Sequence, residues 1–109
     1  MADTLGTFEQ AVLVAILRLG ADGYGRRILL DVQERLGREL ASGAVYATLD
    51  RLEAKGLVTS KLAPGTPQRD GRVRRYYVLT AAGVRALNES RKTTERIWRG
   101  LTWPLKGRI

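Results

Sequence analysis

Arginine and lysine are the side chains whose types and spacing could do chemistry in this sequence, and that chemistry is the binding of anions. Residues 55–75 carry six basic side chains against one acid, Asp70. The formal net charge of the chain is +8, with thirteen basic and three acidic side chains in residues 55–109 against six and eight in residues 1–54. A one-sided basic half attracts polyanions such as nucleic acid or acidic lipid headgroups; a merely solubilising surface is the alternative. The six are Lys55, Lys61, Arg69, Arg72, Arg74 and Arg75.

Other chemistry is largely excluded by composition. The chain has neither cysteine nor histidine, so Ser-His or Cys-His catalysis and an ordinary zinc site are ruled out. We therefore expect no enzyme, no metal and no cofactor. The longest near-apolar stretch, 11–17, is too short to span a bilayer, and the first ten residues hold two acids and no Lys or Arg. The absence of cysteine fits a reducing compartment, and we expect one cytoplasmic domain without a membrane partner.

The first element of the fold that positions the basic segment is a helix expected over residues 8–19. Thr7 and Gln10 form the pattern of a capping box, and apolar residues then recur at helical spacing from Phe8 to Leu19. Leu13 and Leu17 fall on a second face. The helix is therefore either enclosed in its own core or packed partly against a partner, and the pattern leaves both open.

Two further helices follow, over residues 24–36 and 43–55. Gly37 and Gly56 stand where helices end, and Ser42 is a good N-cap residue. The inner face of the third helix is apolar, through Val45, Leu49 and Leu52. Its outer face is small or hydrogen-bonding, through Ala44, Tyr46, Ala47, Thr48 and Arg51.

A β-hairpin and a fourth helix complete the expected fold, which is mainly α with a small β-hairpin. Strands are predicted over 57–62 and 73–79, joined by a polar tip. Alternation places Tyr77 and Leu79 in the core and Arg72 and Arg74 outside. Thr80 caps a helix over 81–99, and the last residues form a weak tail.

Three helices, a basic hairpin and a further helix form the element order of a winged helix-turn-helix. A helix fits the major groove of double-stranded DNA, and a hairpin beside it can touch the flanking backbone. Each arginine could instead be a solvated surface charge that binds nothing, and Arg75 could be a charge at the strand edge that prevents aggregation. The domain as a whole could instead be a protein-interaction module whose basic hairpin docks an acidic protein. The candidate DNA contacts are Ser42, Gly43, Ala44, Tyr46, Ala47, Arg51, Lys61, Arg69, Arg72, Arg74 and Arg75.

Two motifs in this order resemble PadR-type transcriptional regulators. One is Tyr-x-x-Leu-x-Arg-Leu-Glu-x-x-Gly-Leu, from Tyr46 to Leu57, and the other is Tyr-Tyr-x-Leu-Thr-x-x-Gly, from Tyr76 to Gly83. Tyr24-Gly25 at the start of the second helix fits as well, and the resemblance covers residues 5–90. It is the short form of the family, with a single C-terminal helix.

The resemblance implies a repressor that binds a pseudo-palindromic operator as a homodimer. It implies residues 1–80 as the DNA-binding domain, 81–103 as a dimerisation helix joined by the first helix, and 104–109 as a tail. It also implies that a small aromatic or drug-like effector binds at the dimer interface beside Trp98, unless Trp98 and Trp103 simply pack the dimer. The candidate dimerisation residues are Leu13, Leu17, Leu87, Thr94, Ile97, Trp98 and Leu101, with Val84 beside them.

Overall fold

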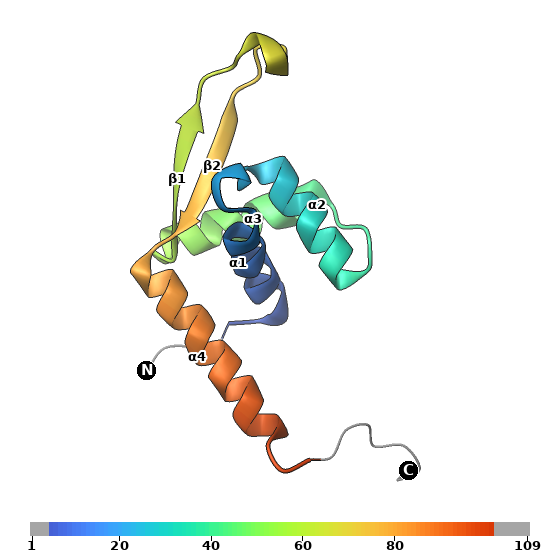
Figure 1. Cartoon of the computed structure of the whole chain (residues 1–109), viewed down its shortest axis with the longest axis vertical. Helices are drawn as coiled ribbons and strands as arrows, with labels where there is room; N and C mark the ends of the chain where they lie inside the picture. Colours follow the sequence, from blue (N-terminus) through green and yellow to red (C-terminus); the bar gives the residue numbers. More distant parts are fainter. Residues whose placement is uncertain (1–4, 102–109) are drawn as a thin grey trace.

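The fold has the predicted order of elements. The computed structural model describes residues 5–101. Within them, three helices are followed by a two-stranded antiparallel hairpin and a long fourth helix (Figure 1). Each predicted helix and strand is confirmed, with bounds that differ by at most one residue. The elements are α1 (Thr7–Leu19), α2 (Gly25–Leu36), α3 (Ser42–Ala54), β1 (Val58–Ala63), β2 (Arg74–Leu79) and α4 (Ala81–Trp98), with short 3-10 turns at Gly20–Asp22 and Pro67–Arg69.

The helix ends follow the predicted glycines more closely than the predicted caps. Gly37 and Gly56 have φ of 69° and 76°, in the left-handed region of the backbone. This conformation ends α2 at Gly37 and prevents α3 from continuing past Gly56. Thr80 is confirmed as the N-cap of α4, because its Oγ1 accepts the N–H of Gly83 at 3.0 Å. The two other predicted caps are wrong. Thr7 and Ser42 are already helical, because the residue before each, Gly6 and Ala41, has the extended backbone that an N-cap needs.

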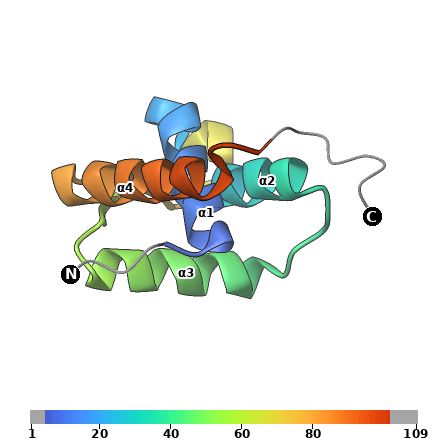
Figure 2. The ribbon, with the colours of Figure 1, turned by 90° about the horizontal axis from the view of Figure 1, so that it is seen from below.

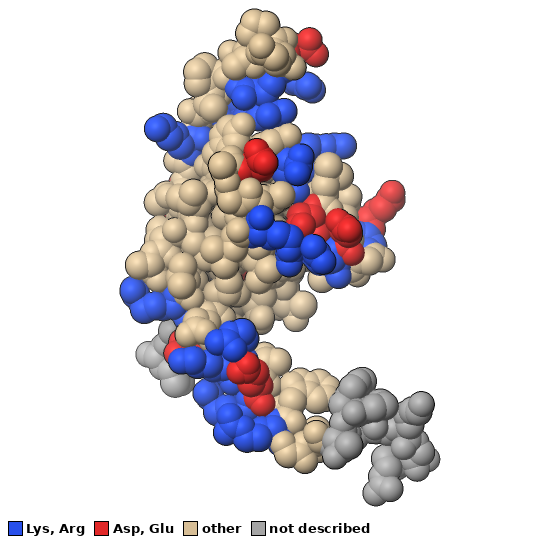
Figure 3. Space-filling view, in the orientation of Figure 1, with Lys and Arg blue, Asp and Glu red and all other residues tan. Residues whose placement is uncertain are grey.

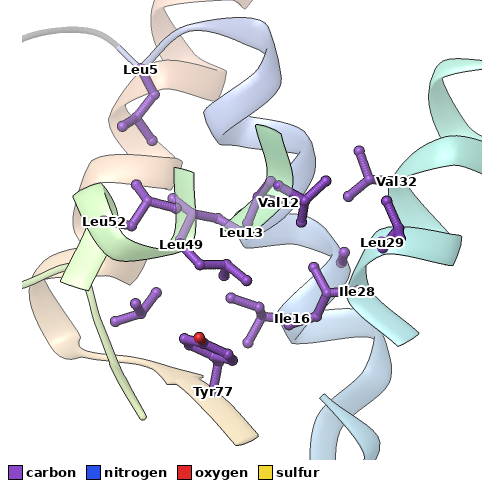
Figure 4. Close-up of a cluster of buried hydrophobic side chains, with 13 residues drawn as sticks. Leu5, Val12, Leu13, Ile16, Ile28, Leu29, Val32, Leu49, Leu52 and Tyr77 are labelled. Carbon is purple, nitrogen blue, oxygen red and sulfur yellow. The ribbon is translucent and has the colours of Figure 1, made fainter. Parts of the chain in front are cut away.

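The core gathers apolar side chains from the first three helices and the hairpin. α1 lies at its centre, between α3 and α4 (Figure 2). Tyr77 of β2 points into the cluster from the hairpin side (Figure 4). The buried apolar residues are Leu5, Val12, Leu13, Ala15, Ile16, Ile28, Leu29, Val32, Val45, Leu49, Leu52, Val58 and Tyr77.

The face of α1 that carries Leu13 belongs to this core. Leu13 is 0% exposed in the single chain, so its assignment to a dimer surface is wrong. α1 is enclosed on several sides, and a helical wheel cannot tell a second covered face from a face that awaits a partner. Leu17, one turn further along, is 53% exposed. Of the two α1 residues singled out for the dimer, Leu17 alone remains available.

The hairpin over residues 58–79, hereafter the wing, stands away from the helices (Figure 1). Its register pairs Val58 with Leu79 and Ala63 with Arg74. The base of β2 is also joined to the turn before α2, because the N–H of Tyr77 donates to the carbonyl of Gly23 at 2.9 Å. The wing is therefore attached to the helical body along its second strand.

α4 begins directly at the end of the wing, since Thr80 alone separates it from β2. Gly83 lies so close to the turn after α3 that an added Cβ would be 2.0 Å from the carbonyl oxygen of Leu57. About two turns later, the buried Ser90 accepts the N–H of Leu5 at 3.0 Å. Beyond Ser90 the helix extends away from the body (Figure 1).

Candidate nucleic-acid interface

The N-terminal half of α3 presents an exposed surface of small side chains and one tyrosine. Val45, Leu49 and Leu52 are buried as predicted, which turns the other side of the helix outward. Ser42, Gly43, Ala44, Tyr46, Ala47 and Arg51 are exposed. All the α3 residues predicted to contact DNA therefore lie at the surface.

Thr48 is the exception among the residues expected on the outer face. It is 1% exposed, and its hydroxyl donates to the carbonyl of Ala44 at 2.9 Å. The hydroxyl oxygen of Thr48 in turn accepts an N–H from Nη2 of Arg51 at 3.0 Å. The expectation that Thr48 faces outward is wrong; this residue instead orients Arg51 from inside the helix.

The ring of Tyr46, from α3, packs against the first turn of α2. A Cβ added to Gly25 would be 2.5 Å from Cε1 of Tyr46, so the ring occupies the space that any larger residue at Gly25 would fill. The sequence suggested Gly25 only as part of a helix start. The structure gives a reason for glycine there: it lets the ring of Tyr46 rest on the backbone of α2.

A groove of about 580 Å³ separates α3 and the start of α2 from the wing. Lys and Arg side chains gather over the wing and the neighbouring end of α2 (Figure 3). The groove joins aromatic rings to guanidinium groups, which suits a partner that is anionic and partly apolar. It is lined by Tyr24, Gly25, Arg26, Tyr46, Arg72, Val73, Arg74, Arg75 and Tyr77.

The arginines of the wing are held in different ways. At the tip, Arg69 donates to the carbonyls of Pro64 and Arg72, and Arg72 donates back to the carbonyl of Arg69 at 3.1 Å. In β2, Arg75 donates to Ser60 at 2.9 Å. Arg74 stacks on an aromatic ring, with its Cζ 3.9 Å from the centre of Tyr24.

Lys61, also predicted to contact DNA, is an exposed residue of β1. Lys55, which contributes to the basic count of residues 55–75, is paired instead. Its Nζ lies 2.9 Å from Oε2 of Glu9, and this hydrogen bond holds the pKa of Glu9 below its usual value. Burial raises the pKa of Tyr77 above its usual value.

A second, apolar groove of about 610 Å³ runs between α1 and α4. Leu17, Leu87 and Thr94 from the predicted dimerisation set line it, together with Val84. Ile97, Trp98 and Leu101 are exposed beyond it, at 69%, 50% and 55%. Trp103 and the predicted tail, 104–109, lie outside the described residues.

Sequence reasoning missed Tyr24 and Arg26 as members of the first groove. Their signal was present in Tyr-Gly-Arg-Arg, residues 24–27, which places two arginines in the first turn of a helix. Nothing in that pattern indicates that the wing, about fifty residues later, lies against it. Within residues 5–101, no helix is both long and apolar enough to cross a membrane, and no cluster of His, Cys, Asp or Glu could hold a metal ion.

A helical trio with an exposed third helix and a basic hairpin at its side defines a winged helix-turn-helix protein. This chain belongs to the PadR-like family of transcriptional regulators, whose family model matches residues 12–89. The fold and family predicted from the motifs are thereby confirmed.

Individual relatives agree with this assignment. The chain is 40% identical over 93 residues to the transcriptional regulator Rv3488 of Mycobacterium tuberculosis, covering 82% of this chain and 80% of the relative. It is similar to the crystal structure of a PadR family transcription regulator from Clostridium difficile R20291, with 32% identity, a TM-score of 0.63, and coverage of 84% of this chain and 90% of that one. It also resembles the RosR structure of H. salinarum, with 27% identity, a TM-score of 0.67, and coverage of 94% and 84%.

Proposed function

We propose that this regulator is a repressor that binds a pseudo-palindromic operator in double-stranded DNA as a homodimer. One observation carries the proposal: the exposed half of α3 lies beside a groove lined by arginines of the wing and of α2. An α-helix about 10–12 Å across matches the width of the major groove. The small residues Gly43, Ala44 and Ala47 allow the helix backbone to approach the bases closely.

The division of labour within the interface follows from the side chains. Tyr46 can contact a sugar or a thymine methyl, and Arg51 a phosphate or a guanine edge. Lys61, Arg69, Arg72, Arg74 and Arg75 are assigned to the DNA backbone, which they would bind regardless of sequence. α3 thus determines which operator is preferred, and the wing contributes affinity for any duplex.

The apolar surface shared by α1 and α4 is the proposed dimer interface. Leu17, Leu87, Ile97, Trp98 and Leu101 lie there, partly or largely exposed, and exposed apolar side chains that gather on one surface mark interaction sites. Dimeric helix-turn-helix proteins read half-sites about 34 Å apart, and the proposed dimer would have to hold its two copies of α3 at that spacing. In this division residues 1–80 are assigned to DNA binding and 81–103 to dimerisation; the proposed DNA partner is consistent with a cytoplasmic location.

A small aromatic or drug-like effector is assigned to the same interface. The groove between α1 and α4, at about 610 Å³, is within the usual range for small-molecule sites. Trp98, which is exposed beyond this groove, would stack on a molecule that extends out of it. The competing role for Trp98 is packing of the dimer alone, and a quench of tryptophan fluorescence by the effector, retained in a Trp103→Phe variant, separates the two.

DNA binding is tested by titrating the protein onto the DNA upstream of its own gene at several salt concentrations. We expect log K to fall with log salt by about 0.9 for each phosphate contacted. Arg74→Ala should weaken binding to all duplexes, whereas substitutions at Ala44 or Tyr46 should change the preferred sequence. Equal losses on specific and random duplexes from both kinds of change would refute the assigned reading surface. No binding at any salt would favour the acidic-protein module instead.

The dimer is tested by sedimentation of Leu17→Glu and Trp98→Glu. Both should sediment as monomers and lose operator affinity. Leu30→Glu is the matched control, because Leu30 is a similarly exposed leucine (44%) on α2 that does not line the groove between α1 and α4. An unchanged sedimentation profile of the first two variants would contradict the proposed interface.

A further inference from the structure

Arg74 and Tyr24 form a stack in the first groove, which lies between the wing and the starts of α2 and α3. The Cζ of Arg74 lies 3.9 Å from the centre of the Tyr24 ring. Tyr24 meets Tyr76 on β2 edge to face, with ring centres 5.5 Å apart and an interplanar angle of 63°. A guanidinium over a tyrosine face is attracted by the ring quadrupole, and this attraction strengthens where water is partly excluded.

The backbone of Tyr24 is held in place from two sides. Its backbone pairs with that of Tyr76 in an antiparallel bridge. Its carbonyl accepts the N–H of Ile28 at 3.0 Å, as the N-cap of α2. Tyr24 is therefore attached both to the helix that faces the groove and to the strand that carries Arg74. With its backbone joined to both elements and its ring packed edge to face on Tyr76, Tyr24 can define where a stacked side chain lies.

Arg74 differs from the other wing arginines in how its N–H groups are used. Arg69, Arg72 and Arg75 each donate to an oxygen of the protein. Among the residues that the structure describes, the Arg74 side chain makes no hydrogen bond and instead stacks on Tyr24. Stacking uses the face of the guanidinium and leaves its N–H edges able to bind a phosphate bidentately.

We propose that Tyr24 is a positioning residue for the Arg74–phosphate contact, an inference that rests on the proposed function of DNA binding. An arginine that is already stacked loses less rotamer freedom when it binds a phosphate. Tyr24 itself need not touch the DNA. Its contribution to affinity passes through Arg74.

The test is a double-mutant cycle on a random-sequence duplex, because backbone contacts do not depend on sequence. Tyr24→Leu removes the aromatic face and should weaken binding about fivefold, the size expected for a partly exposed cation–π contact. Tyr24→Phe keeps the face and should bind like the original. In an Arg74→Ala background, Tyr24→Leu should have no further effect. In an Arg72→Ala background, the matched control, the loss of about fivefold should persist.

A second measurement needs neither DNA nor a variant that could misfold. The Tyr24 ring current should shift the Arg74 side-chain NMR signals upfield in the original protein, and Tyr24→Phe should preserve the shift. Equal losses from Tyr24→Leu in the presence and absence of Arg74 would overturn the proposal, since Tyr24 would then act by supporting the wing generally. No loss in either background, or no ring-current shift, would overturn it too. If the original protein bound no duplex but showed the shift, the proposed function would have failed while the stack itself stood.

Discussion

Substituting Gly83 by alanine should destabilise the protein, although alanine is the better helix former. Gly83 lies in the first turn of α4, against the turn that follows α3. The added Cβ would be 2.0 Å from the carbonyl oxygen of Leu57, and real Cβ contacts essentially never fall under 3.0 Å. Helix and turn must therefore separate by about 1 Å, as the difference between these distances requires.

The cost follows from what that separation breaks. The same Leu57 oxygen accepts the N–H of Thr80 at 3.0 Å, and a displacement of this size removes the hydrogen bond. A partly buried hydrogen bond that is lost without replacement costs about 1–3 kcal/mol, to which poorer packing adds. The intrinsic gain of alanine over glycine in a helix is about 1 kcal/mol. We expect a net loss of about 2 kcal/mol, or a midpoint lower by about 10 °C in a domain of this size.

Thermal unfolding followed by circular dichroism measures this, with Gly43→Ala as the control. Gly43 is also helical, but a Cβ there would have nothing within 4 Å. This variant should be as stable as the original or more stable, by up to about 0.5–1 kcal/mol. Opposite signs for one chemical change at two sites are the expected result. A Gly83→Ala protein that melts at or above the original temperature would refute the close approach of α4 to Leu57.

Three further expectations concern single contacts. Ser90→Ala should lower the unfolding free energy by about 1–3 kcal/mol in a denaturant titration, because it leaves a backbone N–H without its acceptor in the protein interior; an unchanged midpoint would contradict this. The pKa of Glu9, followed by NMR, should lie below its usual value and rise in Lys55→Met. Since the folded pKa is the lower one, this pair stabilises the protein above the unfolded pKa and its contribution disappears as the pH falls through the folded one. Gly25→Ala should leave the fold intact but displace the ring of Tyr46, so its operator preference should change more than its melting temperature, and an unaltered preference would count against Tyr46 as a reading residue.

Local signals predicted the elements of this fold well. Gly37 and Gly56 end their segments because a left-handed backbone costs glycine almost nothing, and this preference is a property of the residue itself. The predicted N-caps Thr7 and Ser42 failed by one residue each. Capping depends on which residue adopts the extended backbone, and the choice between neighbours is made by the surrounding structure.

The candidate site was predictable only as far as it is encoded along single elements. Spacing separated the inner and outer faces of α3, except at Thr48, whose hydroxyl is satisfied within its own helix. Leu13 was misassigned because α1 is covered from several directions at once. Tyr24 and Arg26 join the wing through contacts between distant segments, which no local periodicity contains.

The single residue between β2 and α4 makes the wing and the last helix mechanically one piece. The hydroxyl of Thr80 donates to the carbonyl of Gly56 and accepts the N–H of Gly83, and its amide donates to the carbonyl of Leu57. The connection between β2 and α4 is therefore held on several sides. α4 contains 18 residues, a lever of about 27 Å at 1.5 Å per residue. A tilt of about 5° about its first turn would move its far end by about 2 Å. That rotation must either bend β2 or break the contacts at Leu57, because the hydrogen bonds of Thr80 leave the connection between β2 and α4 little freedom to rotate.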